Sequence, residues 1–151
     1  LTDVEEWQWD NVMNVNVKGP FFLLKQIAPI MKAQGGGSII NISSYMGIRC
    51  EETLGVYCIS KAAVLHMTRC MAKEWGKWNI RVNSIAPAWV HSRLSEPFLK
   101  LPGVNDRMLG QTVINRFGEP DDVAALALFL ASDAGKNQTA GCFPLDYGML
   151  T

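Results

Sequence analysis

A tyrosine and a lysine are spaced for proton transfer in the middle of the chain. Tyr57 and Lys61 are four residues apart, so on a helix they share one face and an ammonium group can lie beside a phenol. A phenol with its ordinary pKa of about 10 is a poor base at neutral pH, but a neighbouring positive charge lowers that pKa. The pair is therefore a candidate proton-transfer device.

Ser44 precedes Tyr57 by thirteen positions and follows a short β-branched run. If that run is a parallel strand, Ser44 lies at the edge where open α/β sheets bind ligands. Its hydroxyl could then hold a substrate carbonyl or alcohol oxygen while the phenol exchanges the proton. The alternative is a serine that only caps a turn, which is the common role of serine at a strand end.

The elements that must position these groups alternate along the chain. Hydrophobic periodicity and turn residues predict an interrupted helix over 4–32, a strand over 38–43, a helix over 56–75, a strand over 80–86, a helix that begins at 119–122 and continues to 131, and a strand over 142–146. This alternation is typical of a doubly wound α/β domain with a parallel sheet. Only three strands are visible, so the apolar strand over 38–43 is expected at an edge that another strand would cover.

Local signals refine the ends of these elements. Thr2 and Glu5 form a capping-box pattern at the start of the first helix, and Gly19 and Pro20 are expected to bend it. Residues 88–117 contain scattered prolines and glycines and are expected to form an irregular, mobile flap over the site. His91 lies in this flap, either as a structural residue or facing a ligand.

Composition excludes several classes of function. Apolar residues make up 48% of the 151 residues, and 14 basic residues balance 14 acidic ones. A neutral chain of this kind is expected to bind neither nucleic acid nor a membrane surface, and no apolar run is long enough to span a bilayer. Four cysteines without paired spacing and two histidines predict no metal site, and reduced thiols favour a cytoplasmic location.

Six short segments together carry a family resemblance. In order and spacing, residues 16–19, 37–44, 57–61, 80–87, 116–120 and 130–133 resemble the short-chain dehydrogenase/reductase family, and the similarity extends over essentially the whole chain. The resemblance implies a partial doubly wound, Rossmann-like parallel sheet, comprising the last three strands with their flanking helices. Residues 1–151 would form the C-terminal catalytic part of a single domain.

The resemblance also implies a role for each matching residue. Tyr57 matches the general acid/base, and Lys61 the residue that lowers its pKa and binds the nicotinamide ribose. Ser44 matches the residue that polarises the substrate oxygen, and Asn16 the one that holds a water linking the lysine to solvent. Taken alone, Asn16 could equally be a polar residue that bends or caps a helix. The nicotinamide end of a bound NAD or NADP would be contacted by Tyr57, Lys61, Pro87, Ala88, Val90 and Ser92.

The sequence departs from the family pattern in two respects. The N-terminal unit with a glycine-rich, phosphate-binding turn has no counterpart in the chain, so a missing N-terminal segment or a separate chain is expected to supply it. Ala88, Ala140 and Tyr147 stand where the family has glycine. A Cβ at a left-handed position costs about 1 kcal/mol or more, and Tyr147 could instead serve a subunit contact.

The expected function is NAD(P)-dependent interconversion of a small alcohol and its ketone by hydride transfer, in a homodimer or homotetramer, with the fragment alone inactive. Two alternatives remain open. The chain could be a truncated, inactive product that acts as an interaction module through its long helices. It could also belong to a dehydratase or epimerase that uses the same four residues without net redox change.

Overall fold

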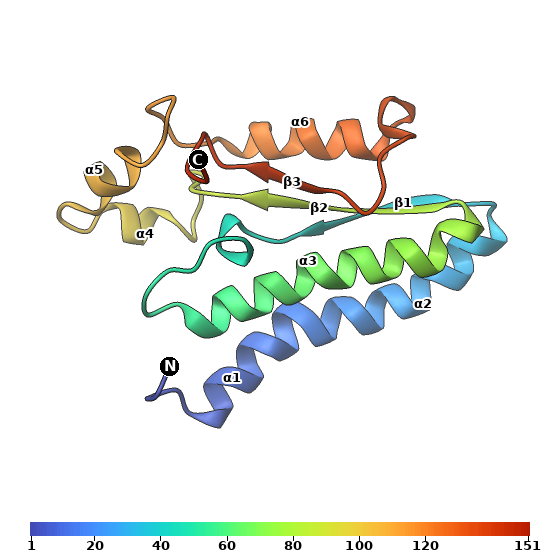
Figure 1. Ribbon diagram of the computed structural model, residues 1–151, viewed down its shortest axis with the longest axis horizontal. Coiled ribbons are helices and arrows are strands. Elements are labelled where there is room, and N and C mark those ends of the chain that lie inside the picture. Colours follow the sequence, from blue (N-terminus) through green and yellow to red (C-terminus); the bar gives the residue numbers. More distant parts are fainter.

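Three parallel strands form the centre of the computed structural model, which describes residues 1–151. The strands β1 (Gly37–Ile42), β2 (Ile80–Pro87) and β3 (Cys142–Leu145) lie in the order β1-β2-β3. Helices α2 and α3 cover one face of the sheet and α6 covers the other (Figure 1). The predicted α/β class, the parallel sheet and the position of β1 at an edge are confirmed.

The first helical stretch has three parts: α1 (Glu6–Met13), a π-helical turn (Asn14–Lys18) and α2 (Gly19–Ala33). The predicted interruption is confirmed, but it comes before Gly19, because proline is compatible with the first turn of α2. A capping box is present, but it lies one turn later than predicted. Glu5 is the N-cap and Gln8 its partner, so the helix begins after Glu5.

The main core lies between β1, β2 and the helices on their shared face. Helix α3 (Gly55–Trp75) lies in the connection between these two parallel strands. The buried side chains of this core come from α2, α3 and the two strands, and they are Leu24, Ala28, Ile39, Met71, Ala72, Ile80 and Val82. Their packing fixes the strand ends against α3. No helix has the length and hydrophobicity needed to cross a membrane.

The segment predicted as an irregular flap contains two short helices, α4 (Glu96–Leu99) and α5 (Val104–Leu109). Both lie beyond the carboxyl ends of the strands (Figure 1). Leu99, Met108 and Phe117 form a small core beneath them. The prediction of irregular structure is therefore wrong at these helices, which are too short to show a helical period in the sequence.

Helix α6 (Pro120–Ala131) begins at its predicted position and leads to β3. Short 3₁₀ turns lie at residues Tyr45–Gly47, Gly76–Trp78 and Asp133–Gly135.

Two of the three residues that replace expected glycines adopt left-handed backbone conformations. Ala140 has φ 59° and Tyr147 has φ 58°, which confirms that the expected strain falls at these positions. Ala88 is not among the residues with positive φ. The ring of Tyr147 lies against Gly118, where an added Cβ would be 1.7 Å from the tyrosine oxygen.

Candidate active site

Ser44 lies two residues beyond the end of β1, at the carboxyl edge where its position predicts it. Its backbone is extended and it caps the 3₁₀ turn that follows, with its Oγ accepting a 3.2 Å hydrogen bond from the Met46 N–H. The same oxygen lies 3.5 Å from the Pro87 carbonyl, at the end of the neighbouring strand. The turn-capping interpretation is thus correct, and the cap holds the hydroxyl between two strand ends.

Tyr57 and Lys61 share one face of α3, as their spacing predicts. The Lys61 Nζ lies 5.5 Å from the centre of the Tyr57 ring. Tyr57 is half-buried, its phenol lies near the Ser44 side chain, and its ring packs against the buried cluster of Tyr45, Met46, Cys58 and Met149. The structure therefore brings Ser44, Tyr57 and Lys61 together at one edge of the sheet.

The strand end and the loop after it hold Lys61 by both its backbone and its side chain. Lys61 Nζ donates a 3.2 Å hydrogen bond to the Ile42 carbonyl, and Ser43 Oγ donates one of 2.8 Å to the Lys61 carbonyl. Gly47 packs on the same peptide, because an added Cβ would lie 2.7 Å from the Lys61 carbonyl carbon. These contacts fix the lysine relative to Ser44, and the sequence analysis did not single out Ser43 or Gly47.

Asn16 lies in the π-helical turn, and its side chain positions α3. Its Nδ2 donates a 2.9 Å hydrogen bond to Ser60 Oγ, and that hydroxyl donates a 2.7 Å bond to the Tyr57 carbonyl. Ser60 is fully buried. Asn16 is therefore linked to the helical turn that carries both Tyr57 and Lys61. Sequence analysis missed Ser60, whose one signal is a small polar residue on a mostly apolar helix face.

The electrostatics of the pair differ from the expectation. Burial raises the pKa of the Tyr57 phenol, and the nearby Ser44 side chain offsets part of that rise. Burial also lowers the pKa of the Lys61 ammonium. The expected lowering of the Tyr57 pKa is thus not seen in this structure, because loss of solvent around the phenol is the largest cause of the shift and raises the pKa. Tyr57 is held as a neutral phenol, which is a proton donor.

The residues expected at the nicotinamide end follow β2 in order. Pro87 closes the strand, Ala88 N–H donates a 3.0 Å hydrogen bond to the Leu145 carbonyl, and Val90 bridges to the segment before α6. All three are half-buried, whereas Ser92 is exposed and bonded within the flap. Pro87, Ala88 and Val90 therefore line the carboxyl edge, and Ser92 lies farther along the flap.

Comparison with known proteins gives consistent matches over the whole chain. Residues 1–150 match the family model described as enoyl-(acyl carrier protein) reductase. The 3-oxoacyl-[acyl-carrier-protein] reductase FabG of Thermotoga maritima is 39% identical over 99% of this chain and 60% of its own length. The NAD-dependent glycerol dehydrogenase of Listeria innocua is 38% identical over 97% of this chain and 57% of its own length.

Solved structures share the fold of the whole chain. The crystal structure of a gluconate 5-dehydrogenase from Burkholderia cenocepacia, in complex with NADP and tartrate, superimposes with a TM-score of 0.95 at 29% identity. The match covers 99% of this chain and 58% of that structure. The chain thus spans less than two thirds of these relatives. With the family model matched from end to end and the parallel sheet shared, the chain belongs to the short-chain dehydrogenase/reductase family.

Proposed function

We propose that this chain forms the catalytic part of an NAD(P)-dependent oxidoreductase that interconverts an alcohol and a carbonyl compound. The observation that carries the proposal is the placement of Ser44, Tyr57 and Lys61 together at the carboxyl edge of the sheet, with the Lys61 ammonium 5.5 Å from the centre of the Tyr57 ring and the Tyr57 phenol near the Ser44 side chain. Open α/β sheets bind their ligands at this edge. Asn16 has a positioning role through Ser60.

The direction of the Tyr57 pKa shift suits reduction of a carbonyl group. A raised pKa keeps the phenol protonated at neutral pH, so Tyr57 Oη can donate its proton to the oxygen of a substrate carbonyl held by Ser44. A bound nicotinamide cofactor supplies or accepts the hydride at the carbon. In the reverse direction the phenolate takes the proton of the alcohol, and the Lys61 cation stabilises that phenolate.

The residues present fit a nicotinamide cofactor. An ammonium group has three N–H donors, and Lys61 uses one of them on the Ile42 carbonyl. The other donors are available for ribose hydroxyls. Pro87, Ala88 and Val90 supply half-buried, largely apolar surface at the same edge, where a nicotinamide ring can lie.

The rest of the cofactor site is proposed to come from outside these 151 residues. The relatives that the chain matches are longer, and the chain contains no glycine-rich turn followed by a helix of the kind that binds pyrophosphate. We propose NAD or NADP without choosing between them. All four cysteines are free thiols, which favours a reducing compartment such as the cytoplasm.

The test compares two forms of the protein. One is the chain itself, and the other is the chain joined to the nucleotide-binding portion of the Thermotoga maritima relative. Each is titrated with NADH and NADPH by nicotinamide fluorescence and then assayed by absorbance with a panel of small alcohols and ketones. We expect binding and turnover in the joined form. No cofactor binding in either form would contradict the proposal.

An inactive interaction module is the second candidate, and two observations favour it. Ala140 and Tyr147 adopt left-handed conformations where the family has glycine, and α1 and α2 expose apolar side chains such as Trp7 and Leu23. Self-association without cofactor binding would support this role. Turnover without net change in nicotinamide absorbance would instead identify a dehydratase or epimerase.

A further inference from the structure

Alternate side chains at the end of β1 contact α3. Ile39, Asn41 and Ser43 are two positions apart, and the Ser43 N–H continues the strand pairing with a 2.8 Å hydrogen bond to the Ile85 carbonyl, so all three side chains point to one face. Ile39 packs in the apolar core with Met71 of α3. Asn41 and Ser43 are 8% and 3% exposed and are hydrogen-bonded to α3. Toward the carboxyl edge, the contact of β1 with α3 therefore changes from apolar to polar.

Asn41 is bonded to a buried threonine of α3. Its Nδ2 donates a 2.9 Å hydrogen bond to Thr68 Oγ1, and that hydroxyl donates a 2.8 Å bond to the Val64 carbonyl. The buried side chains of α3 about one turn to either side of Thr68 are all apolar: Val64, Leu65, Met71 and Ala72. A shift of α3 by one turn would therefore leave the Asn41 amide buried without its partner, which costs free energy. The pair favours a single register of the helix on the strand.

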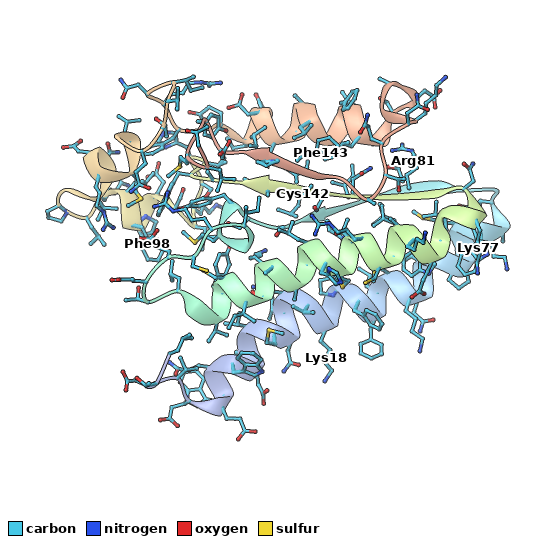
Figure 2. All side chains as sticks on the ribbon, viewed as in Figure 1. Lys18, Lys77, Arg81, Phe98, Cys142 and Phe143 are labelled. Atoms are coloured by element: carbon cyan, nitrogen blue, oxygen red, sulfur yellow. The ribbon has the colours of Figure 1, made fainter.

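Ser43 makes the second contact, closer to the start of α3. Its Oγ donates a 2.8 Å hydrogen bond to the carbonyl of Lys61, which precedes Thr68 by two helical turns. Figure 2 shows Lys77, which follows α3, at the end of the molecule opposite to Phe98 of α4, so α3 runs back from the carboxyl edge. The contact nearer that edge thus holds the residue that carries the ammonium group.

Directional bonds fix a register that apolar packing leaves loose. The hydrophobic effect has no direction, whereas a hydrogen bond weakens steeply outside a narrow range of distance and angle. Ser44 follows β1, while Tyr57 and Lys61 belong to α3. The position of α3 along β1 therefore sets the distances from the phenol and the ammonium group to the Ser44 hydroxyl.

We propose that Asn41 and Ser43 are positioning residues for the proposed reaction, because their hydrogen bonds to α3 set the register at which Tyr57 and Lys61 lie beside Ser44. The effect on turnover rests on the proposed function, whereas the register is a property of the folded chain. Displacement of a reacting group by about 1 Å can lower a rate by a factor of about 10². A slip of α3 much smaller than one turn is therefore sufficient to reduce turnover.

The first experiment examines the register without turnover. Asn41→Leu combined with Thr68→Val replaces both partners by apolar side chains of nearly the same shape, so the hydrogen bond is removed and neither partner is left unpaired. We expect the midpoint of urea unfolding to stay close to that of the parent chain. The amide resonances of residues 57–61 in the ¹⁵N-labelled chain should nevertheless shift or broaden, although these residues lie two turns or more from Thr68. Unchanged resonances at 57–61 would overturn the proposal, whatever the enzymatic result.

Ser38→Ala is the matched control on the same strand. Ser38 Oγ donates a 3.0 Å hydrogen bond to the Leu130 carbonyl of α6, which covers the opposite face of the sheet (Figure 1). The substitution removes one side-chain hydrogen bond of β1 without touching α3, and the resonances of residues 57–61 should stay in place. Equal shifts in the control and in the Asn41–Thr68 variant would show that any change in β1 disturbs the site, and the proposal would be wrong.

The second experiment measures turnover in the chain joined to the nucleotide-binding portion of the Thermotoga maritima relative. Ser43→Ala and the Asn41–Thr68 variant should each lower kcat about tenfold or more, with a smaller change in KM, and Ser43→Thr, which keeps the hydroxyl, should restore kcat. A kcat equal to that of the parent in both variants would overturn the proposal. A parent without turnover would contradict the proposed function alone, and the resonances of residues 57–61 would still decide the register.

Discussion

Tyr57 is the residue on which the proposed chemistry depends, and its hydroxyl can be removed with little effect on packing. Tyr57→Phe keeps the ring against Tyr45, Met46 and Cys58 and removes only the hydroxyl, which lies near the Ser44 side chain. We expect turnover to fall by about 10²–10⁴-fold, with an unchanged free energy of unfolding to within about 1 kcal/mol.

The matched control is Tyr45→Phe, which removes the hydroxyl of a neighbouring buried tyrosine that has no hydrogen-bond partner. Nicotinamide absorbance reports turnover, and urea denaturation reports stability. Equal loss of activity in both variants would show that the cluster, and not the Tyr57 hydroxyl, is responsible.

Ionisation of the Tyr147 phenol is expected to make the free energy of unfolding depend on pH. Burial, followed by the nearby Asp122 carboxylate, raises the pKa of its phenol from an ordinary value near 10 to about 12. As the pH rises, the unfolded state therefore loses the Tyr147 proton before the folded state does. The contribution of this difference to the free energy of unfolding is fully present below about pH 10 and is lost as the pH rises toward 12. Urea denaturation across this pH range should show that the free energy of unfolding falls more steeply for the parent protein than for Tyr147→Phe. Parallel curves would contradict the shift.

The residues of the site differ in how far they could be predicted. Tyr57 and Lys61 are neighbours because the helical period brings residues four apart together, and Ser44 follows from the position of the strand. The Asn16–Ser60 hydrogen bond joins residues 44 positions apart and depends on how two helices pack, which no local pattern encodes. The raised pKa of Tyr57 likewise depends on burial in the folded chain.

Among the elements, those with long periodic patterns were predictable and short or irregular ones were not. Helix α3 and strand β2 have clear hydrophobic periods. The π-helical turn at Asn14–Lys18 has no distinctive residue within it, and α4 and α5 span four and six residues. Such short elements are fixed by tertiary packing and not by propensity.

The contact between the 3₁₀ turn at Tyr45–Gly47 and α3 predicts the effect of a substitution at Gly47. Gly47→Ala places a Cβ 2.7 Å from the Lys61 carbonyl carbon, and backbone cannot move aside as a side chain can. The loop must shift, so we expect a loss of about 1–3 kcal/mol in stability and a fall in turnover as Ser44 moves. Urea denaturation and kcat measure the two effects.

Gly76→Ala is the control for this substitution. Gly76 ends α3 with helical φ and has no atom within 4 Å of an added Cβ, so its replacement should be neutral or stabilise by up to about 1 kcal/mol. A Gly47→Ala variant as stable and active as Gly76→Ala would show that the loop adapts freely.

For the whole molecule, an apolar stripe along α2 supports self-association. Leu23 and Ile30 are seven residues apart, lie on one face of α2 and are 60% and 57% exposed. We propose that a second copy of the chain covers this face. Leu23→Glu with Ile30→Glu would then bury two charges in the contact, and sedimentation velocity should show a shift to monomer.

Leu94→Glu, at an apolar residue 76% exposed in the flap, is the control and should leave the sedimentation profile unchanged. Association that survives the double substitution in α2 would place the contact elsewhere on the molecule. Monomeric parent protein at all concentrations would contradict a homo-oligomer outright.

The packing of Tyr147 on Gly118 makes the identities of two distant positions interdependent. A tyrosine at 147 requires a residue without a side chain at 118, and Gly118 also exchanges backbone hydrogen bonds with Trp89 and His91. If both codons were randomised together and folded clones selected, alanine at 118 should be recovered only beside a small residue at 147. Exchange of residue 118 alone for a larger one would therefore fail where exchange of the pair succeeds.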